Sequence, residues 1–244
     1  MNKSEILDLI LLKQEGSYWD FKREWYFQDK KADLLHDIIC MANNLSNRDA
    51  YIIVGVDEEN DYSFSSVKSD PNRRNTQQLV YFIREKHFAG GVRPIVSVES
   101  LVFDEIEIDV IVVHNCATTP FYLTENFQSV MPNNIYTRVM DSNTPKNKSA
   151  DLPHIETLWK KRFGLLSSPL ERMMIYLKNP DLWKSSPNDY PTKKQYYSFF
   201  LNLQSRLFMM KAKMDISIIY LTKRIFILDG MTSTCIITKQ CLLH

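Results

Sequence analysis

The chain has 244 residues, of which 44% are hydrophobic and 24% are charged, and its formal net charge at pH 7 is +1. This composition is typical of a globular protein and excludes a disordered chain. Because the charges balance, any surface for nucleic acid must be a local basic patch. The chain has only six glycines and no Walker loop or Gly-x-Gly-x-x-Gly motif, which disfavours phosphate-loop architectures.

The cysteines and the apolar runs indicate the cellular compartment in which we expect the protein. The four cysteines have no C-x-x-C spacing, so we expect neither a zinc site nor a disulfide framework. The N-terminal apolar run is interrupted by acids and does not resemble a signal peptide. No apolar run is long enough to cross a bilayer. We therefore expect a soluble, cytoplasmic protein.

The first 44 residues predict a helix, a strand and a second helix. Ser4 is a plausible cap for the first helix, whose apolar residues fall on one face. Residues 18–25 mix aromatic and charged side chains, which is typical of a strand with one face in water. Residues 33–41 have apolar residues at helical spacing, and Asn43 and Asn44 should end that helix.

The most hydrophobic strand of the sequence spans residues 50–56. Its consecutive apolar, largely β-branched residues indicate a strand buried on both faces. Gly55 stands where the chain must bend or where another backbone comes close. Asp57 and Glu58 follow directly, where the strand leaves the core, and there a rigid scaffold would position their carboxylates.

The following segments complete one domain. A polar, Pro-containing loop over residues 114–133 is of the kind that often carries function. The other predicted elements are a short strand at 62–67, a helix at 76–87, a hairpin formed by 95–103 and 106–113 around Asp104 and Glu105, a strand at 134–139, and a helix from Asp151 toward Gly164. This order predicts an α/β or α+β domain, a mixed sheet flanked by helices, over residues 1–164.

Two further segments follow that domain. Residues 165–200 read as a helical and then Pro-rich extension. Residues 201–244 lack clear periodicity and keep unshielded apolar residues to the end, so we interpret them as an atypical tail. One explanation is translation out of frame, and the alternative is a genuine but unusual segment. We expect this tail to pack poorly on the domain and to carry no site.

Acidic residues mark a candidate metal site. Glu15 and Asp20 flank the turn into the first strand, and they would converge with Glu58 or Asp57 if that strand lies beside residues 50–56. Clustered acids repel one another, so they persist mainly where a divalent cation lies between them. Mg²⁺ or Mn²⁺ held there could orient a water and stabilise a scissile phosphate. The alternative is that each acid is a solvated surface group.

Four motifs occur in order along residues 10–164. Glu15-x-x-x-x-Asp20-Phe21-Lys22 is followed by a helix ending in Ala42-Asn43-Asn44, then by Gly55-Val56-Asp57-Glu58, and later by Tyr136-x-Arg138-Val139 with Ser142-Asn143. Together they resemble the Schlafen AlbA_2 domain. That family usually has Glu-x-x-x-x-Glu-Phe-Lys, Ala-Phe-Ala-Asn, a Gly-Gly pair and Gly-Val-x-Asp. Here Asp20 and Glu58 each exchange one acid for the other, and Asp49-Ala50 replaces the glycine pair.

The resemblance implies nucleic-acid binding and, in some Schlafen proteins, metal-dependent cleavage of structured RNA. Carried over by position, the catalytic acids would be Glu15, Asp20 and Glu58, and Asp57 is a further candidate metal ligand. Many bacterial relatives are described as ATP-binding, but the missing phosphate loop argues against ATP here. Because two such lobes often face each other in the family, one lobe per chain suggests a homodimer.

Basic and aromatic residues complete the candidate nucleic-acid surface. The candidates for phosphate contacts are Lys22, Arg23, Arg73, Arg74, Arg138, Lys146 and Lys148. The alternative for each is ordinary surface solubility. Tyr18, Trp19, Trp25 and Tyr26 could stack on bases, although we expect most of them to belong to the core.

We therefore expect a domain that binds nucleic acid, RNA rather than DNA, with metal-dependent endonuclease activity as a candidate. Two alternatives stay open. One is a non-catalytic DNA- or RNA-binding regulator in which the acids are structural, and the other is a nucleotide-binding module.

Overall fold

The computed structural model describes residues 2–166, Ser168 and six strands in the C-terminal part of the chain. The chain divides into two compact units, residues 1–166 and 167–244, and each is described by itself. Within the described residues, no helix is both long and apolar enough to span a membrane.

The second unit contains one antiparallel sheet. Its strands follow the order β14-β13-β12-β11-β10-β9. They are β9 (Trp183–Ser185), β10 (Lys194–Tyr197), β11 (Gln204–Phe208), β12 (Ile216–Leu221), β13 (Arg224–Asp229) and β14 (Ile236–Ile237). The predictions for residues 165–200 and 201–244 fall largely outside the described residues and stay predictions.

The first unit is built on a four-stranded mixed sheet. Strands β1 (Trp19–Lys22) and β2 (Ala50–Val54) are parallel, and β6 (Ile106–Val113) and β5 (Val96–Phe103) continue the sheet in antiparallel fashion, in the order β1-β2-β6-β5. The predicted pairing of the first strand with the central strand is therefore confirmed. Together with four helices, this sheet confirms the α+β class.

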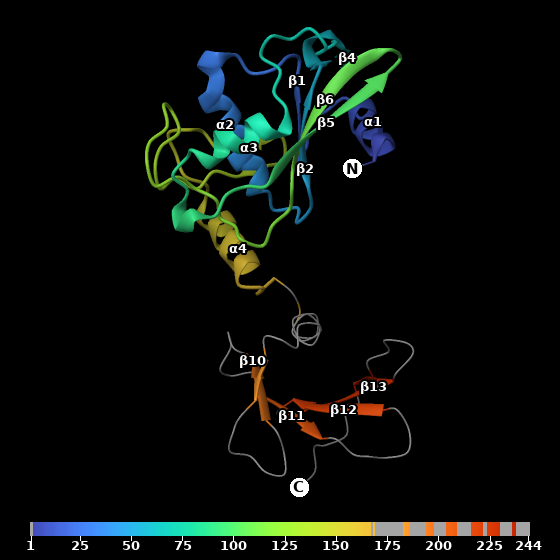
Figure 1. Ribbon diagram of the computed structural model, residues 1–244, viewed down its shortest axis with the longest axis vertical. Helices are drawn as coiled ribbons and strands as arrows, with labels where there is room; N and C mark the ends of the chain where they lie inside the picture. Colours follow the sequence, from blue (N-terminus) through green and yellow to red (C-terminus); the bar gives the residue numbers. More distant parts are fainter. Residues whose placement is uncertain are drawn as a thin grey trace. The chain divides into compact units, whose positions relative to one another are not determined.

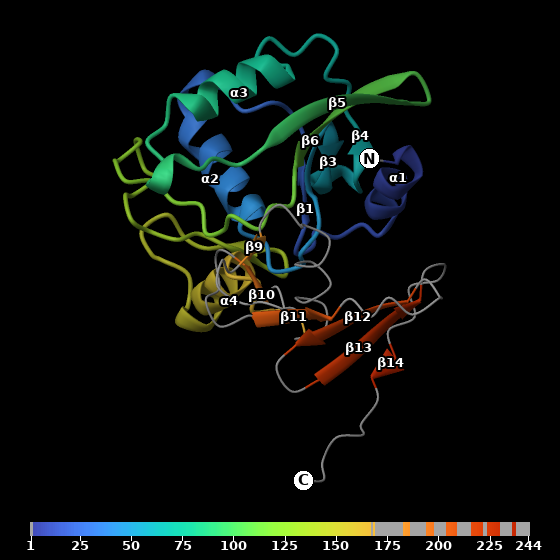
Figure 2. The same ribbon diagram turned by 60° about the horizontal axis from the view of Figure 1, so that its bottom comes forward.

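Helices cover both faces of this sheet. α1 (Lys3–Leu11) lies on one face, and α2 (Lys31–Ala42) and α3 (Thr76–Arg84) lie on the other (Figures 1 and 2). The alternation of side chains along β2 explains this, since Tyr51 and Ile53 belong to the cluster that contains the apolar residues of α1. Ile52 and Val54 instead belong to the cluster with α2 and α3. Each fully buried aliphatic side chain contributes roughly 1.5–3 kcal/mol.

Short elements connect these layers. They are η1 (Gln28–Lys30), β3 (Val56–Asp57) paired with β4 (Ser63–Phe64), η2 (Glu58–Asn60), η3 (Ala89–Gly91), β7 (Arg138–Val139) paired with β8 (Ser142–Asn143), and α4 (Leu152–Arg162).

Gly55 breaks the long central strand into β2 and β3. Its φ of +106° is unfavourable for residues with a side chain, and an added Cβ would lie 2.7 Å from the backbone oxygen of Ser65. The Ser65 N–H donates a hydrogen bond to the Gly55 carbonyl at 2.9 Å. The expectation of a bend with a closely approaching backbone is therefore confirmed, and it sends Asp57 away from the sheet.

Three local predictions differ from the structure. The first strand is shorter than expected and lacks a wet face, because Trp19, Asp20 and Phe21 are all buried. The first helix is capped by Asn2, whose side chain accepts a hydrogen bond from the Ser4 N–H, rather than by Ser4. The strand predicted at 134–139 is reduced to β7.

The reason for the short β7 lies in how the preceding backbone is satisfied. The N–H of Ile135 donates to the Ser149 hydroxyl at 3.0 Å, and the N–H of Thr137 donates to the Thr144 hydroxyl at 3.1 Å. Because these two backbone N–H groups bond to side-chain hydroxyls, they do not need a neighbouring strand as a hydrogen-bond acceptor.

A buried carboxylate in β6 was not anticipated from the sequence. Asp109 is fully buried and accepts hydrogen bonds from Trp25 Nε1 at 2.8 Å, Ser100 Oγ at 2.7 Å, and Arg73 Nε and Nη2 at 2.8 and 2.7 Å. A buried charge is tolerated when it is paired and fully hydrogen-bonded. Asp109 thereby joins the sheet to the segments that precede α2 and α3.

Asp109→Ala should lower the free energy of unfolding by about 3 kcal/mol, because Arg73 and the Trp25 indole lose their acceptor. Glu107 is the matched control: it also pairs with Arg73, but its side chain is 24% exposed, so Glu107→Ala should cost less than about 1 kcal/mol. Urea denaturation of both variants measures the difference, and equal losses would contradict the assigned role of Asp109.

Candidate functional site

The site is built at the free edge of β1. The Phe21 N–H at this edge donates to Glu15 Oε1 at 3.1 Å, so the side chain of Glu15 takes the place of a neighbouring strand. The intervening turn requires Gly16, because an added Cβ would lie 2.2 Å from the ring of Trp19. Glu15 is therefore held against the strand that carries Asp20.

Arg138, at the start of β7, lies between these two acids. Its Nη2 is 2.6 Å from Glu15 Oε2 and its Nη1 is 3.3 Å from Asp20 Oδ1. Its Nε donates to the Gly16 carbonyl at 2.7 Å, and Nη1 donates to Asn143 Oδ1 at 3.1 Å. The side chain is only 2% exposed. We call Glu15, Asp20 and Arg138 the acid–arginine cluster.

Protonation differs between the two acids of the cluster. Burial, followed by the hydrogen bond to Asp20 and the charge of Asp20, raises the pKa of Glu15 from its ordinary value of 4.5 to about 8. Burial alone would raise the pKa of Asp20, but the hydrogen bond to Glu15 and the charges of Lys22 and Arg138 lower it. Asp20 is therefore the ionised member at neutral pH, and Glu15 holds the proton.

Lys22 adds a second cation on the same side of β1. Its ammonium group donates hydrogen bonds to Asp20 Oδ2 and to the Phe21 carbonyl. Burial alone would lower the pKa of Lys22, but the charges of Asp20 and Asp37 outweigh burial and raise it. The ionised carboxylate of Asp20 is thus balanced by cations of the chain itself.

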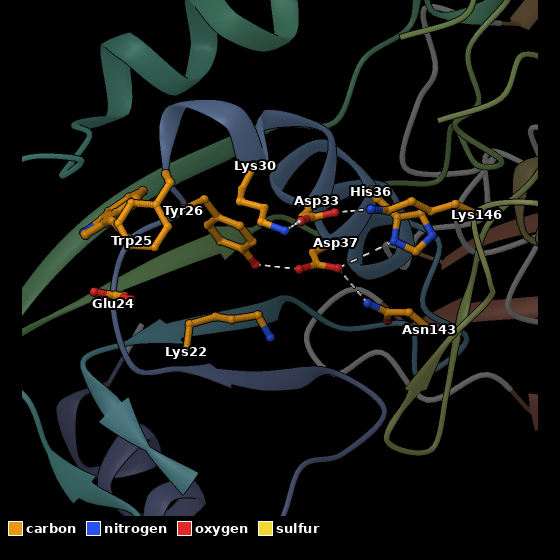
Figure 3. Close-up of a pocket in the computed structure, with 11 residues that line it drawn as sticks. Lys22, Glu24, Trp25, Tyr26, Lys30, Asp33, His36, Asp37, Asn143 and Lys146 are labelled. Atoms are coloured by element: carbon orange, nitrogen blue, oxygen red, sulfur yellow. Dashed lines mark hydrogen bonds and ion pairs between the residues drawn. The ribbon is translucent and has the colours of Figure 1, made fainter. Parts of the chain in front are cut away.

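Hydrogen bonds continue from the cluster toward α2. Asn143 Nδ2 donates to Asp37 Oδ1 at 2.9 Å, and the Tyr26 hydroxyl donates to Asp37 Oδ2 at 2.6 Å (Figure 3). Burial and the charge of Asp37 raise the pKa of Tyr26 well above its ordinary value. Tyr26 is therefore a neutral donor, and Asp37 is fully engaged by the chain.

A pocket of about 460 Å³ opens beside this chain of hydrogen bonds. Its lysines come from three segments, since Lys22 lies on β1, Lys30 in η1 and Lys146 after β8 (Figure 3). Asp33 of α2 lies between two of them, 3.9 Å from the Lys30 ammonium and in contact with that of Lys146. The lining residues are Lys22, Glu24, Trp25, Tyr26, Phe27, Lys30, Asp33, His36, Asp37, Asn143 and Lys146.

Glu58 and Asp57 occupy different surroundings near the cluster. Burial and then the charge of Asp20 raise the pKa of Glu58, which places Glu58 within electrostatic reach of Asp20. Asp57 instead forms an ion pair with Arg23 at 3.6 Å. Of the acids predicted for a metal site, Glu15 and Asp20 both contact Arg138, and Glu58 is their exposed neighbour.

The arrangement does not fit a divalent cation as it stands. Within residues 2–166, no three His, Cys, Asp or Glu side chains are grouped so that they could hold a metal ion. The physical reason is that Arg138 already occupies the space between Glu15 and Asp20, and a dication there would be repelled by Arg138 and Lys22.

The residues predicted to bind nucleic acid separate into three groups, of which the third, Arg73, Arg74 and Arg138, bonds within the chain. Lys22 and Lys146 line the pocket, and Arg23 and Lys148 are exposed. Arg138 is buried, and each of its guanidinium nitrogens has a partner within the chain. The guanidinium of Arg138 is therefore bonded to groups within the chain, so it is not free to bind a phosphate.

Sequence reasoning missed the aromatic residue that the pocket exposes. Trp19, Trp25 and Tyr26 are buried, so the expectation that most of these aromatic residues are core is confirmed. Phe27, the next residue along the chain, is 47% exposed and lines the pocket. The available signal was an aromatic residue directly before the polar run of residues 28–31.

Stability should depend on pH through Glu15. A raised folded-state pKa means that the folded chain binds this proton more tightly than the unfolded chain does. The resulting stabilisation is full below about pH 4.5 and is lost as the pH rises through about 8. Glu15→Gln cannot ionise, so between about pH 5 and 8 its unfolding free energy should fall less than that of the wild type.

Urea denaturation across this pH range, with a chelator present, measures the effect. Glu105→Gln, in the exposed hairpin turn, is the control and should follow the wild type. An unchanged pH dependence in Glu15→Gln would contradict the shared proton.

Comparisons with known proteins agree with the four motifs. The profile of the family described as Schlafen, AlbA_2 matches residues 15–147, just over half of the chain. No curated protein matches. A solved domain from Nitrosomonas europaea, the N-terminal domain of a protein related to the ATP-dependent DNA helicase RecG, is 16% identical with a TM-score of 0.41, and the match covers 62% of this chain and 97% of that domain.

The DIP2311 protein from Corynebacterium diphtheriae is 20% identical with a TM-score of 0.36. That match covers 53% of this chain and only 22% of the DIP2311 chain. The family match covers the acid–arginine cluster and every residue that lines the pocket. The chain belongs to the Schlafen AlbA_2 family, which associates it with nucleic acids.

Proposed function

We propose that the first unit binds nucleic acid, RNA in preference to DNA, through the pocket and its lysines. The observation that supports this proposal is the convergence of Lys22, Lys30 and Lys146 on one pocket beside the acid–arginine cluster. Family membership points in the same direction. The preference for RNA follows from the pocket, because folded RNA presents unpaired nucleotides in loops and bulges.

The lysines differ in how readily they can contact phosphate. The side chains of Lys30 and Lys146 are 58% and 29% exposed and share Asp33, which is itself 36% exposed. Exposed ion pairs contribute at most about 1 kcal/mol, so a phosphate can compete for these ammonium groups. Lys22 pairs with the buried Asp20 and is the most firmly positioned of the three.

Arg23 and Lys148 extend this basic surface beyond the pocket. Both are exposed, and within the part of the chain that the structure describes Arg23 pairs with Asp57 at 3.6 Å. Contacts of this kind position a backbone without reading base sequence. The charge balance of the cluster favours a binding domain over an enzyme, because Glu15 holds a proton and the cations that neutralise Asp20 belong to the chain.

Charge reversal on this surface should weaken binding of unrelated sequences alike. For Arg23→Glu and Lys148→Glu, affinity should fall for every RNA tested, and the slope of log K against log salt should become shallower by about 1 per lost phosphate contact. Fluorescence anisotropy over a salt series provides the measurement.

Lys160→Glu is the matched control for these two variants. Lys160 is exposed on α4, pairs with Glu156, and lines neither the pocket nor the cluster. Affinity that ignores salt, or an equal loss in Lys160→Glu, would count against the proposed surface.

A second candidate function is metal-dependent endonuclease activity with Mg²⁺ or Mn²⁺. The observation in its favour is that Asp20 acts electrostatically on both Glu15 and Glu58. Metal binding by these three acids would require Arg138 to release its carboxylates. We therefore expect binding without cleavage.

Incubation of labelled tRNA with the full chain and Mn²⁺ tests this expectation. Cleavage by the wild type should not exceed that of Glu15→Ala or of Glu58→Ala, a variant that removes an exposed side chain and should fold as the wild type does. Mn²⁺-dependent cleavage that both variants lose would establish the nuclease. A second readout is the melting temperature, which Mn²⁺ should leave unchanged in the absence of RNA.

A further inference from the structure

We propose that the pocket accepts one unstacked nucleotide of the bound RNA, with its base against Phe27, the edge of the base at Lys30, Lys146 and Asp33, and its phosphates at Lys22. This inference rests on the proposed function and adds the form of RNA that the site selects. It predicts a preference for RNA that contains an unpaired nucleotide over a continuous duplex.

The size of the pocket is the first argument. Its volume of about 460 Å³ lies within the range of roughly 300–1,000 Å³ that is typical of small-molecule sites. A single nucleotide is a ligand of this class. The bases of a continuous duplex are stacked and paired, so no single base is free to enter such a pocket.

Phe27 supplies a surface on which a base can stack. It follows two buried aromatic residues, Trp25 and Tyr26, yet it is 47% exposed itself. The ring contacts found among the described residues do not involve Phe27. An exposed ring at the wall of a pocket stabilises a bound base by about 1–3 kcal/mol and tolerates any base identity.

The walls of the pocket can satisfy the polar edge of a base. Lys30 and Lys146 provide donors, and the half-exposed carboxylate of Asp33 between them provides an acceptor (Figure 3). Bases carry both donors and acceptors on their edges. A pocket that offered only donors or only acceptors could not bond to both kinds of group on the edge of a base.

Two residues connect the pocket to the acid–arginine cluster. Lys22 lines the pocket and bonds Asp20, and Asn143 lines the pocket and accepts from Arg138. A nucleotide in the pocket therefore brings its phosphates to Lys22, whose position the cluster fixes. This arrangement gives the buried cluster a role in orienting the RNA.

The test compares two RNA hairpins whose stems are closed by a non-nucleotide linker and which differ by one bulged nucleotide, so the hairpin without the bulge has no unpaired nucleotide. The wild-type full chain should bind the bulged hairpin at least about fivefold more tightly, which corresponds to the lower end of the stacking contribution. Phe27→Ala should lose this preference and keep its affinity for the hairpin without the bulge. Phe27→Trp should retain the preference, because it keeps an aromatic surface.

Tyr81→Ala is the matched control, since Tyr81 is 53% exposed on α3 and does not line the pocket. Its hairpin affinities should equal those of the wild type. Adenosine monophosphate, titrated into the complex with each hairpin, tests whether a free nucleotide can occupy the pocket in place of a nucleotide of the RNA. If adenosine monophosphate displaces the bulged hairpin alone, the pocket also accepts a free nucleotide. If it displaces neither hairpin and the preference for the bulge is retained, the pocket accepts a nucleotide only together with its flanking strand.

Equal affinity of the wild type for both hairpins would overturn the inference, as would a preference that Phe27→Ala retains. In either case salt-dependent binding of both hairpins would leave the proposed function intact. A wild type that binds neither hairpin would contradict both proposals.

Discussion

The contact of Arg138 with Glu15 and Asp20 is the interaction on which the functional end of the domain depends. It joins segments more than 100 residues apart in the sequence and closes the free edge of β1. A buried guanidinium is tolerated only when its donors are satisfied, and those of Arg138 are met by two acids, one carbonyl and one amide. Removing Asp20 would leave a charge unpaired in the interior, and removing any other partner would leave a buried donor of Arg138 unsatisfied.

This constraint also determines which groups can act on a ligand. The acids of the cluster are neutralised internally, Asp37 is occupied by Tyr26 and Asn143, and Glu15 keeps a proton. Under the proposed function, the groups that remain available to a nucleic acid are the lysines of the pocket, the exposed ring of Phe27, and the exposed Arg23 and Lys148. Two roles are therefore divided between neighbouring groups of residues. The acid–arginine cluster holds β1 and Lys22 in place, and the pocket provides the proposed contacts with nucleic acid.

Most of the fold could be predicted from the sequence, because its elements have strong local signals. The apolar run of β2, the hairpin turn at Asp104 and Glu105, and the apolar spacing of α2 each identify one element. The functions of Arg138 and Asp109 could not be predicted in this way, because charged residues are usually exposed and only long-range contacts reveal their burial. Phe27 presents the opposite case, since its exposure depends on the loop that follows β1. The homodimer and the interpretation of residues 201–244 as an atypical tail remain predictions.

A crystal structure of the full chain soaked with MnCl₂ tests the central claim most directly, since Mn²⁺ is located by its anomalous scattering. The account predicts that Arg138 lies between the carboxyl groups of Glu15 and Asp20, with no anomalous peak within about 2.6 Å of their oxygens. A peak at that position, with Arg138 displaced from the acids, would contradict it.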